Sequence, residues 1–148
     1  MVNVERVVGS ILGGAIGDGW GGLYEGSLPR GRVRVPEELV VSDDTQLTVA
    51  TCEAIVDAGG IVPERIAERF VVWFLAGRLR GLGASTRKAL RDLDAGAHWA
   101  LSGAKGERSA GNGAAMRVAP LAFLLDPAND LACSVRSISG RCFAGAGG

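Results

Sequence analysis

Three neighbouring residues with oxygen donors, Ser42, Asp43 and Asp44, lie where a polar stretch gives way to an amphipathic one. Carboxylate and hydroxyl oxygens are the ligands that Mg²⁺, Mn²⁺ and Ca²⁺ prefer. Two adjacent carboxylates repel each other unless a cation or the solvent compensates them. An acidic first turn also stabilises a helix by itself, by about 0.3–1 kcal/mol per charge. The residues alone therefore leave a metal site and a plain helix start both open.

A second candidate site lies in the loop "GERSAGNGAAMR", where Gly111, Asn112 and Gly113 stand directly before a predicted helix. Free backbone N–H groups at a helix start can receive a phosphate. Ordinary turn chemistry also explains an Asn-Gly pair. Residues 17–22 have G-x-G-x-x-G spacing, but a helical pattern precedes them, whereas a dinucleotide-binding fingerprint needs a strand there.

The histidine and the cysteines do not suggest a further site. His98 is the only histidine, and no Ser-His-Asp or Cys-His arrangement can be assembled around it. Cys52, Cys133 and Cys142 are odd in number and form no C-x-x-C pair, which argues against a disulfide framework and a zinc site. A reducing cytoplasm is the compartment that fits this usage.

Apolar residues recur at helical spacing along most of the chain, and no long run alternates with a period of two. This pattern predicts an all-α fold. The expected helices cover residues 4–16, residues 43–58, residues 63–75, a short stretch around residues 86–93, and residues 113–124, where Pro120 must kink or divide the helix.

Local signals predict where these helices begin and end. Ser42 is a suitable N-cap, Gly59 and Gly60 should end the same helix, and Pro63 should open the next one. Ser85 or Thr86 should cap the short helix that follows.

The first predicted helix has a ridge of glycines four residues apart, at Gly9, Gly13 and Gly17. Each glycine costs about 1 kcal/mol of helix propensity relative to alanine. We therefore expect another helix or a ligand to approach the backbone closely along this ridge.

The composition limits the classes of partner. The chain has 148 residues, 47% of them hydrophobic, which suits one domain spanning residues 1–148. Sixteen basic and sixteen acidic residues give no net charge, so nothing favours nucleic acid or an anionic membrane as partners. The apolar run near the N-terminus is too short to span a bilayer. The oligomeric state cannot be read from the sequence.

Three motifs in order, "GSILGGAIGDGWGGLYEG", "SDDTQLT" and "GNGAAMRVAPLAF", together with "GLGASTRKAL" between the last two, resemble the ADP-ribosylglycohydrolase family. The resemblance runs from about Glu5 to Arg141 and covers the N-terminal half of the family's pattern. It implies an orthogonal, all-helical domain with two Mg²⁺ or Mn²⁺ ions in a cleft. The implied reaction is hydrolysis of the bond between ribose C1′ and an acceptor, in an ADP-ribosylated protein or another ADP-ribose derivative.

The resemblance also implies roles for individual residues. Ser42, Asp43 and Asp44 would be metal ligands, and Asp44 and Glu25 the catalytic pair, with Glu25 acting as an acid/base or a metal-linked carboxylate. The residues implied to bind substrate are Gly81, Gly83, Ser109, Gly111 and Asn112.

Two features of the family's pattern are missing. No late Asp-x-Asp motif follows Arg117 to complete the metal site, and Cys142-Phe143 stands where the family tends to have Thr-His. We expect that the chain is truncated, that its reading frame diverges near Arg141, and that residues 142–148 form a disordered or non-native tail. Two alternatives to an incomplete hydrolase stay open: an ADP-ribose-binding module without activity, and a metal-free structural helical domain.

Overall fold

Helices make up the regular structure of the described part of the chain. The computed structural model describes residues 3–26, 31–32, 36–102, 113 and 115–125. No strand occurs in these ranges, so the all-α prediction is confirmed. No helix within them is long and apolar enough to cross a membrane. The elements are α1 (Val4–Gly21), η1 (Gly22–Tyr24), α2 (Asp43–Ala58), α3 (Pro63–Leu75), α4 (Ala84–Asp94), η2 (Ala115–Arg117) and η3 (Ala119–Phe123).

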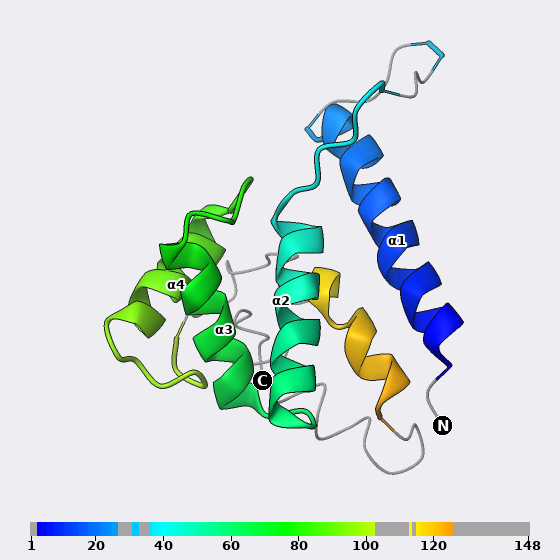
Figure 1. Ribbon diagram of the computed structural model, residues 1–148. Helices are drawn as coiled ribbons and strands as arrows, with labels where there is room; N and C mark the ends of the chain where they lie inside the picture. The colour runs from blue at the N-terminus through cyan, green and yellow to red at the C-terminus, as the bar shows by residue number, and fades with distance from the viewer. Residues whose placement is uncertain (1–2, 27–30, 33–35, 103–112, 114, 126–148) are drawn as a thin grey trace, which may run out of the picture.

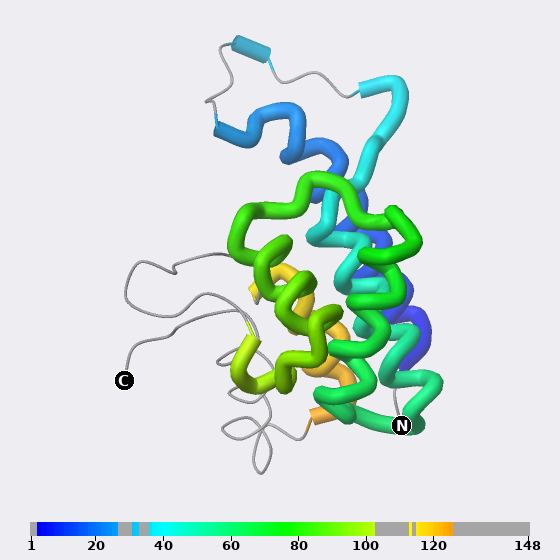
Figure 2. The backbone as a smooth tube through the Cα atoms, turned by 90° about the vertical axis from the view of Figure 1, so that its left-hand side faces the viewer, coloured from blue at the N-terminus to red at the C-terminus, as the bar shows by residue number. Residues whose placement is uncertain are grey.

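The helix α2 lies at the centre of the arrangement (Figure 1). It packs against α3 on one side and against α1, η2 and η3 on the other, and α4 packs against α3. Figure 2 views the molecule from the side of α4, with α1 behind α3 and α4. The N-terminal end of α2 is therefore the place where α1 and the η2–η3 segment can bring their side chains together.

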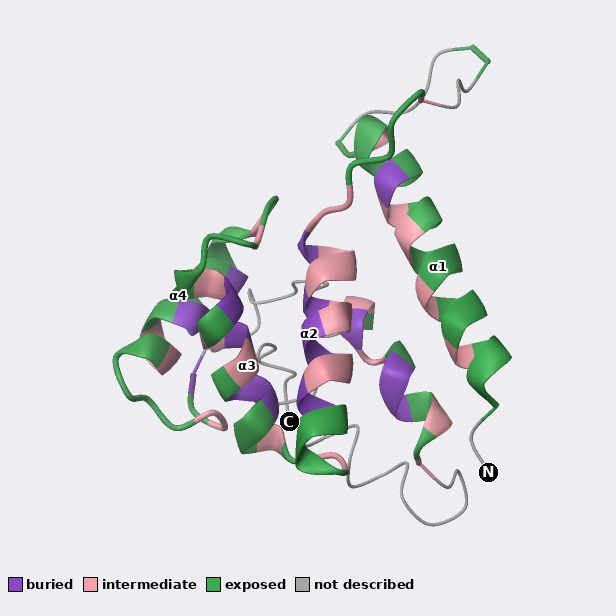
Figure 3. Ribbon diagram, viewed as in Figure 1, coloured by how far each residue is buried: buried purple, intermediate pink, exposed green. Residues whose placement is uncertain are grey.

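The buried residues come mainly from the facing sides of α2 and α3 (Figure 3). Their spacing on each helix is the helical spacing expected from the sequence. The cluster is completed by residues of α4 and η3, and it consists of Leu47, Ala50, Ala54, Ile55, Ile66, Phe70, Trp73, Ala89, Leu90 and Leu121. This core fixes α2 and so holds one wall of the candidate site.

The predicted boundaries of α2 are confirmed. The Ser42 hydroxyl accepts a hydrogen bond from the Asp44 N–H at 3.2 Å, as an N-cap does. Gly59 ends the helix in the left-handed conformation, with φ 68°. Pro63 stands in the first turn of α3, where its missing N–H costs nothing.

The first helix is longer than predicted. The sequence predicts a helix over residues 4–16, whereas α1 continues to Gly21 and η1 follows from Gly22 to Tyr24. Glycines lower helix propensity without forbidding the conformation. Here Asp18, in the last turns of α1, is bonded to the start of α2, and this tertiary contact outweighs the local cost.

Two further expectations are wrong. The stretch around Pro120 forms two short 3₁₀ segments in place of an α-helix, because proline removes one backbone donor and its ring clashes with the preceding turn. The N-cap of α4 is Gly83, without a side-chain hydrogen bond. Thr86, expected at the cap, is buried inside the helix.

The glycine ridge of α1 does not serve helix packing among the described residues. A Cβ added at Gly9, Gly13 or Gly17 would meet no atom within 4 Å. The close approach occurs instead at Gly19, where an added Cβ would lie 3.1 Å from the Leu39 Cβ. Gly17 lines a cavity. Of the two expectations for the ridge, a packed helix or a ligand, the cavity leaves room for a ligand.

Candidate active site

A cavity of about 410 Å³ opens between α1, the first turns of α2 and the η2–η3 segment. Mainly small residues of α1 form one wall and polar residues of α2 form the opposite one. Apolar side chains close it from the third side. In that order the lining residues are Ser10, Ile11, Gly14, Ala15, Gly17, Asp18, Gly21 and Gly22, then Ser42, Asp44, Thr45 and Thr48, then Met116, Ala119, Pro120 and Phe123, with Glu25 just after η1.

The two walls are joined by Asp18. Its Oδ1 accepts from the Ser42 hydroxyl at 2.6 Å, and its Oδ2 accepts from the Ser42 N–H at 2.8 Å. Oδ2 also accepts from the hydroxyl and the N–H of Thr45, at 2.6 and 3.3 Å. Burial alone would raise the pKa of Asp18, but these hydrogen bonds outweigh it and lower the pKa below its usual value.

The adjacent carboxylates Asp43 and Asp44 have different surroundings. Successive helix residues are rotated by about 100°, so the two side chains leave the helix in different directions. Asp44 lines the cavity, whereas Asp43 does not and is only 7% exposed. Asp43 lies beside the loop before α4, since a Cβ added at Gly81 would be 3.3 Å from its Oδ1.

Burial raises the pKa of both carboxyls, and neighbouring negative charges add to the rise. For Asp43 these charges are Asp44, then Asp18 and Glu25; for Asp44 they are Asp18 and Glu25. The site therefore concentrates negative charge at one end of the cavity, where a cation would be stabilised.

Glu25 is the residue to which the family resemblance assigns an acid/base or metal-linked role. It follows η1 and lines the same cavity as Asp44 and Ser42. Asp18, in α1, and Glu25, which follows η1, both line this cavity.

The substrate-binding residues implied by the resemblance are only partly placed. Gly81 contacts Asp43 and Ser42 and has a positive φ of 77°, and its loop is tied to α2 by a 2.7 Å bond from the Arg80 N–H to the Gln46 side chain. Gly83 caps α4 and does not line the cavity. The other implied residues, Ser109, Gly111 and Asn112, and the segment 142–148, lie outside the described residues.

Comparison with known proteins identifies the family. A sequence profile described as ADP-ribosylglycohydrolase matches residues 2–143, nearly the whole chain. The chain belongs to the ADP-ribosylglycohydrolase family. A relative from Archaeoglobus fulgidus, described as an uncharacterized protein, is 36% identical over 100 residues, which are 68% of this chain. The match covers 32% of that relative, so the chain spans about a third of its length.

Sequence reasoning missed three residues that line the cavity, namely Asp18, Thr45 and Thr48. Thr48 donates to the backbone oxygens of Asp44, at 2.7 Å, and Met116, at 3.1 Å, and so ties η2 to α2. A signal for Asp18 was present, because it is the one acid in the glycine-rich, apolar stretch of residues 7–22. His98, set aside from the sequence, does not line the cavity, and its Nδ1 accepts from the Ala100 N–H at 3.2 Å.

Proposed function

We propose that this chain forms the N-terminal part of a metal-dependent hydrolase site that cleaves the ribose C1′ bond of ADP-ribosylated proteins or small ADP-ribose derivatives. Family membership gives the reaction class. The observation that supports the proposal is a cavity lined both by Glu25, which follows η1, and by Ser42 and Asp44 at the start of α2.

The donor set suits a hard divalent cation. Asp44, Glu25 and Ser42 offer only oxygen atoms, which Mg²⁺ and Mn²⁺ prefer, and water completes such a coordination shell. The described residues nevertheless hold no group of three acidic, histidine or cysteine side chains close enough to enclose an ion. The site therefore fits one cation held loosely, on the side of Asp44, and further ligands would be needed for two.

The residues at the start of α2 and Glu25 would have different roles in this reaction. Asp44 and Ser42 would hold the cation, and Asp43, on the far side of the helix start, would fix the loop at Gly81. When bound, the cation would polarise the ribose oxygens and lower the pKa of a nearby water. Glu25 would take a proton from that water as its oxygen attacks C1′, and would return the proton to the departing atom of the acceptor.

Calorimetric titration with Mn²⁺ tests the metal site. Asp44→Asn should weaken binding by at least tenfold, because it removes a charged ligand from the cavity. Asp94→Asn is the matched control, since Asp94 is an exposed acid at the end of α4 and does not line the cavity. Equal Mn²⁺ affinity of both variants and the wild-type protein would contradict the proposed role of Asp44.

A second candidate, an ADP-ribose-binding module without activity, is favoured by the small number of carboxylates gathered at the cavity. Titration with ADP-ribose, with and without Mg²⁺, separates the two when it is combined with assays on ADP-ribosylated arginine and serine. Release of ADP-ribose from either substrate, lost in Glu25→Gln, supports the hydrolase. Binding of ADP-ribose without release supports the module.

A further inference from the structure

The carboxylate of Asp18 accepts a hydrogen bond from the Ser42 hydroxyl, at the edge of the cavity. A serine hydroxyl has one hydrogen and two lone pairs. An ionised carboxylate only accepts, so the hydrogen of Ser42 must point to Asp18 Oδ1, 2.6 Å away. One lone pair accepts from the Asp44 N–H at 3.2 Å. One lone pair remains, and Ser42 lines the cavity.

This arrangement matters because a hydroxyl can bind a cation only through its oxygen. If the hydrogen pointed into the cavity, Ser42 would be a donor there and would repel a cation. Groups that hold a ligand's hydrogen away from a metal orient that ligand and make it a better electron donor.

We propose that Asp18 is a positioning residue that turns the oxygen of Ser42, and not its hydrogen, toward a divalent cation in the cavity. The inference rests on the metal-dependent function proposed above. Asp18 also anchors α1 to α2 through Thr45, so an effect on stability alone would not establish the role.

The variant Asp18→Asn tests whether the Ser42 hydroxyl hydrogen must point to residue 18 for the cation to bind. Three donors converge on Oδ2, namely the Ser42 N–H and both donors of Thr45, so the amide oxygen should take that place. The amide nitrogen then replaces Oδ1 and donates to the Ser42 oxygen, whose hydrogen must turn elsewhere. We expect Mn²⁺ affinity to fall about 10–100-fold, the usual effect of losing such a partner.

Two further variants separate positioning from stability. Thr45→Val removes one bond to Asp18 but leaves the Ser42 pair intact, so it should lower the melting temperature while Mn²⁺ affinity stays within about threefold of wild type. In a Ser42→Ala background, Asp18→Asn should cause no additional loss of affinity, because Asp18 acts through Ser42.

The outcomes are distinguishable. If Asp18→Asn keeps wild-type Mn²⁺ affinity but has a lower melting temperature, Asp18 only anchors the two helices. If Asp18→Asn lowers Mn²⁺ affinity as much in the Ser42→Ala background as in the wild-type protein, Asp18 acts by its charge alone. Either result overturns the inference and leaves the proposed function standing. If the wild-type protein binds no Mn²⁺, the metal part of the proposed function falls, and the inference with it.

A measurement on the wild-type protein decides the matter if Asp18→Asn does not fold. The Ser42 hydroxyl proton, held by a carboxylate, should give an exchange-protected NMR signal that persists when Mg²⁺ is added. Disappearance of that signal on Mg²⁺ addition would overturn the inference.

Discussion

Gly81 lies beside the Asp43 side chain. Its φ of 77° is one that residues with a side chain rarely adopt, and its missing Cβ leaves room for the Asp43 carboxylate. The start of α2 therefore has two different neighbours. The backbone at Gly81 lies beside Asp43, and the cavity lies beside Asp44. Gly96 has a similar φ of 89°, but an added Cβ there would meet no atom within 4 Å among the described residues.

These two glycines predict a graded loss of stability. Gly96→Ala should cost about 1–2 kcal/mol, because the left-handed conformation disfavours a side chain. Gly81→Ala should cost more, since its Cβ would also press on Asp43 at 3.3 Å. Urea unfolding of both variants measures the difference, and equal costs would mean that the Asp43 side chain gives way freely.

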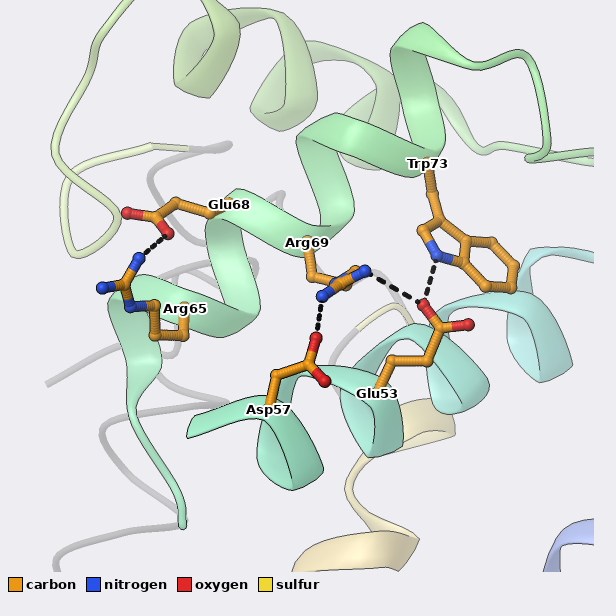
Figure 4. A network of polar contacts seen from close by, with 6 residues as sticks. All are labelled: Glu53, Asp57, Arg65, Glu68, Arg69 and Trp73. Atoms are coloured by element: carbon orange, nitrogen blue, oxygen red, sulfur yellow. Dashed lines mark hydrogen bonds and ion pairs between the residues drawn. The ribbon is translucent and has the colours of Figure 1, made fainter. Parts of the chain in front are cut away.

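At the scale of elements, α2 and α3 are joined by a polar network on their exposed edge (Figure 4). The Trp73 Nε1–H donates to Glu53 at 2.8 Å, and Arg69 bridges Glu53, at 3.5 Å, and Asp57. The pair Arg65–Glu68, in the same figure, lies within α3 and joins nothing else. The network therefore ties together the two helices that carry most of the core.

Glu53→Ala and Glu68→Ala should differ in cost. The first leaves the N–H of the buried Trp73 without its acceptor, which should cost about 1–3 kcal/mol. The second removes an exposed pair worth about 0.2–0.5 kcal/mol. Chemical unfolding followed by tryptophan fluorescence measures both, and a cost for Glu53→Ala no larger than for Glu68→Ala would show that the network contributes little.

Elements with local signals could be predicted, and those set by distant contacts could not. Ser42, Gly59 and Pro63 mark helix ends through their own conformational preferences, so the bounds of α2 and the start of α3 were foreseen. The bond between Asp18 and Ser42 joins residues 24 apart, and no local pattern encodes it. The same limit explains why the acidic pair was expected to act together, although only Asp44 lines the cavity.

At the scale of the whole molecule, α1 turns much of its apolar surface away from the other described elements. Val4, Val8, Leu12 and Ile16 follow one another at four-residue spacing and are all exposed. The shared core, by contrast, includes no residue of α1. Figure 3 shows the difference, with exposed residues along α1 and buried ones along α2.

A matched pair of leucines tests this distribution. Leu47→Ala should cost about 2–5 kcal/mol, because Leu47 is 0% exposed in the core. Leu12→Ala should cost less than about 0.5 kcal/mol, because Leu12 is 58% exposed and alanine is the better helix former. Unfolding in urea compares the two, and a cost above about 2 kcal/mol for Leu12→Ala would mean that α1 is covered in solution.

The glycine wall of the cavity has a consequence for the order in which the protein assembles. The α2–α3 hairpin closes over residues 59–62 and carries most of the core, so it should form early. The helix α1 includes Gly14, Gly17 and Gly21, has little propensity of its own, and joins α2 across residues 22–42. Assembly of the cavity would then be the last step of folding.

Native-state hydrogen exchange can measure that order. Amides of α1 should exchange through openings of lower free energy than those of α2. Mn²⁺ held between the two helices should slow exchange in α1 more than in α3. Equal protection of α1 and α2 without Mn²⁺ would instead mean that the cavity and the core open as one unit.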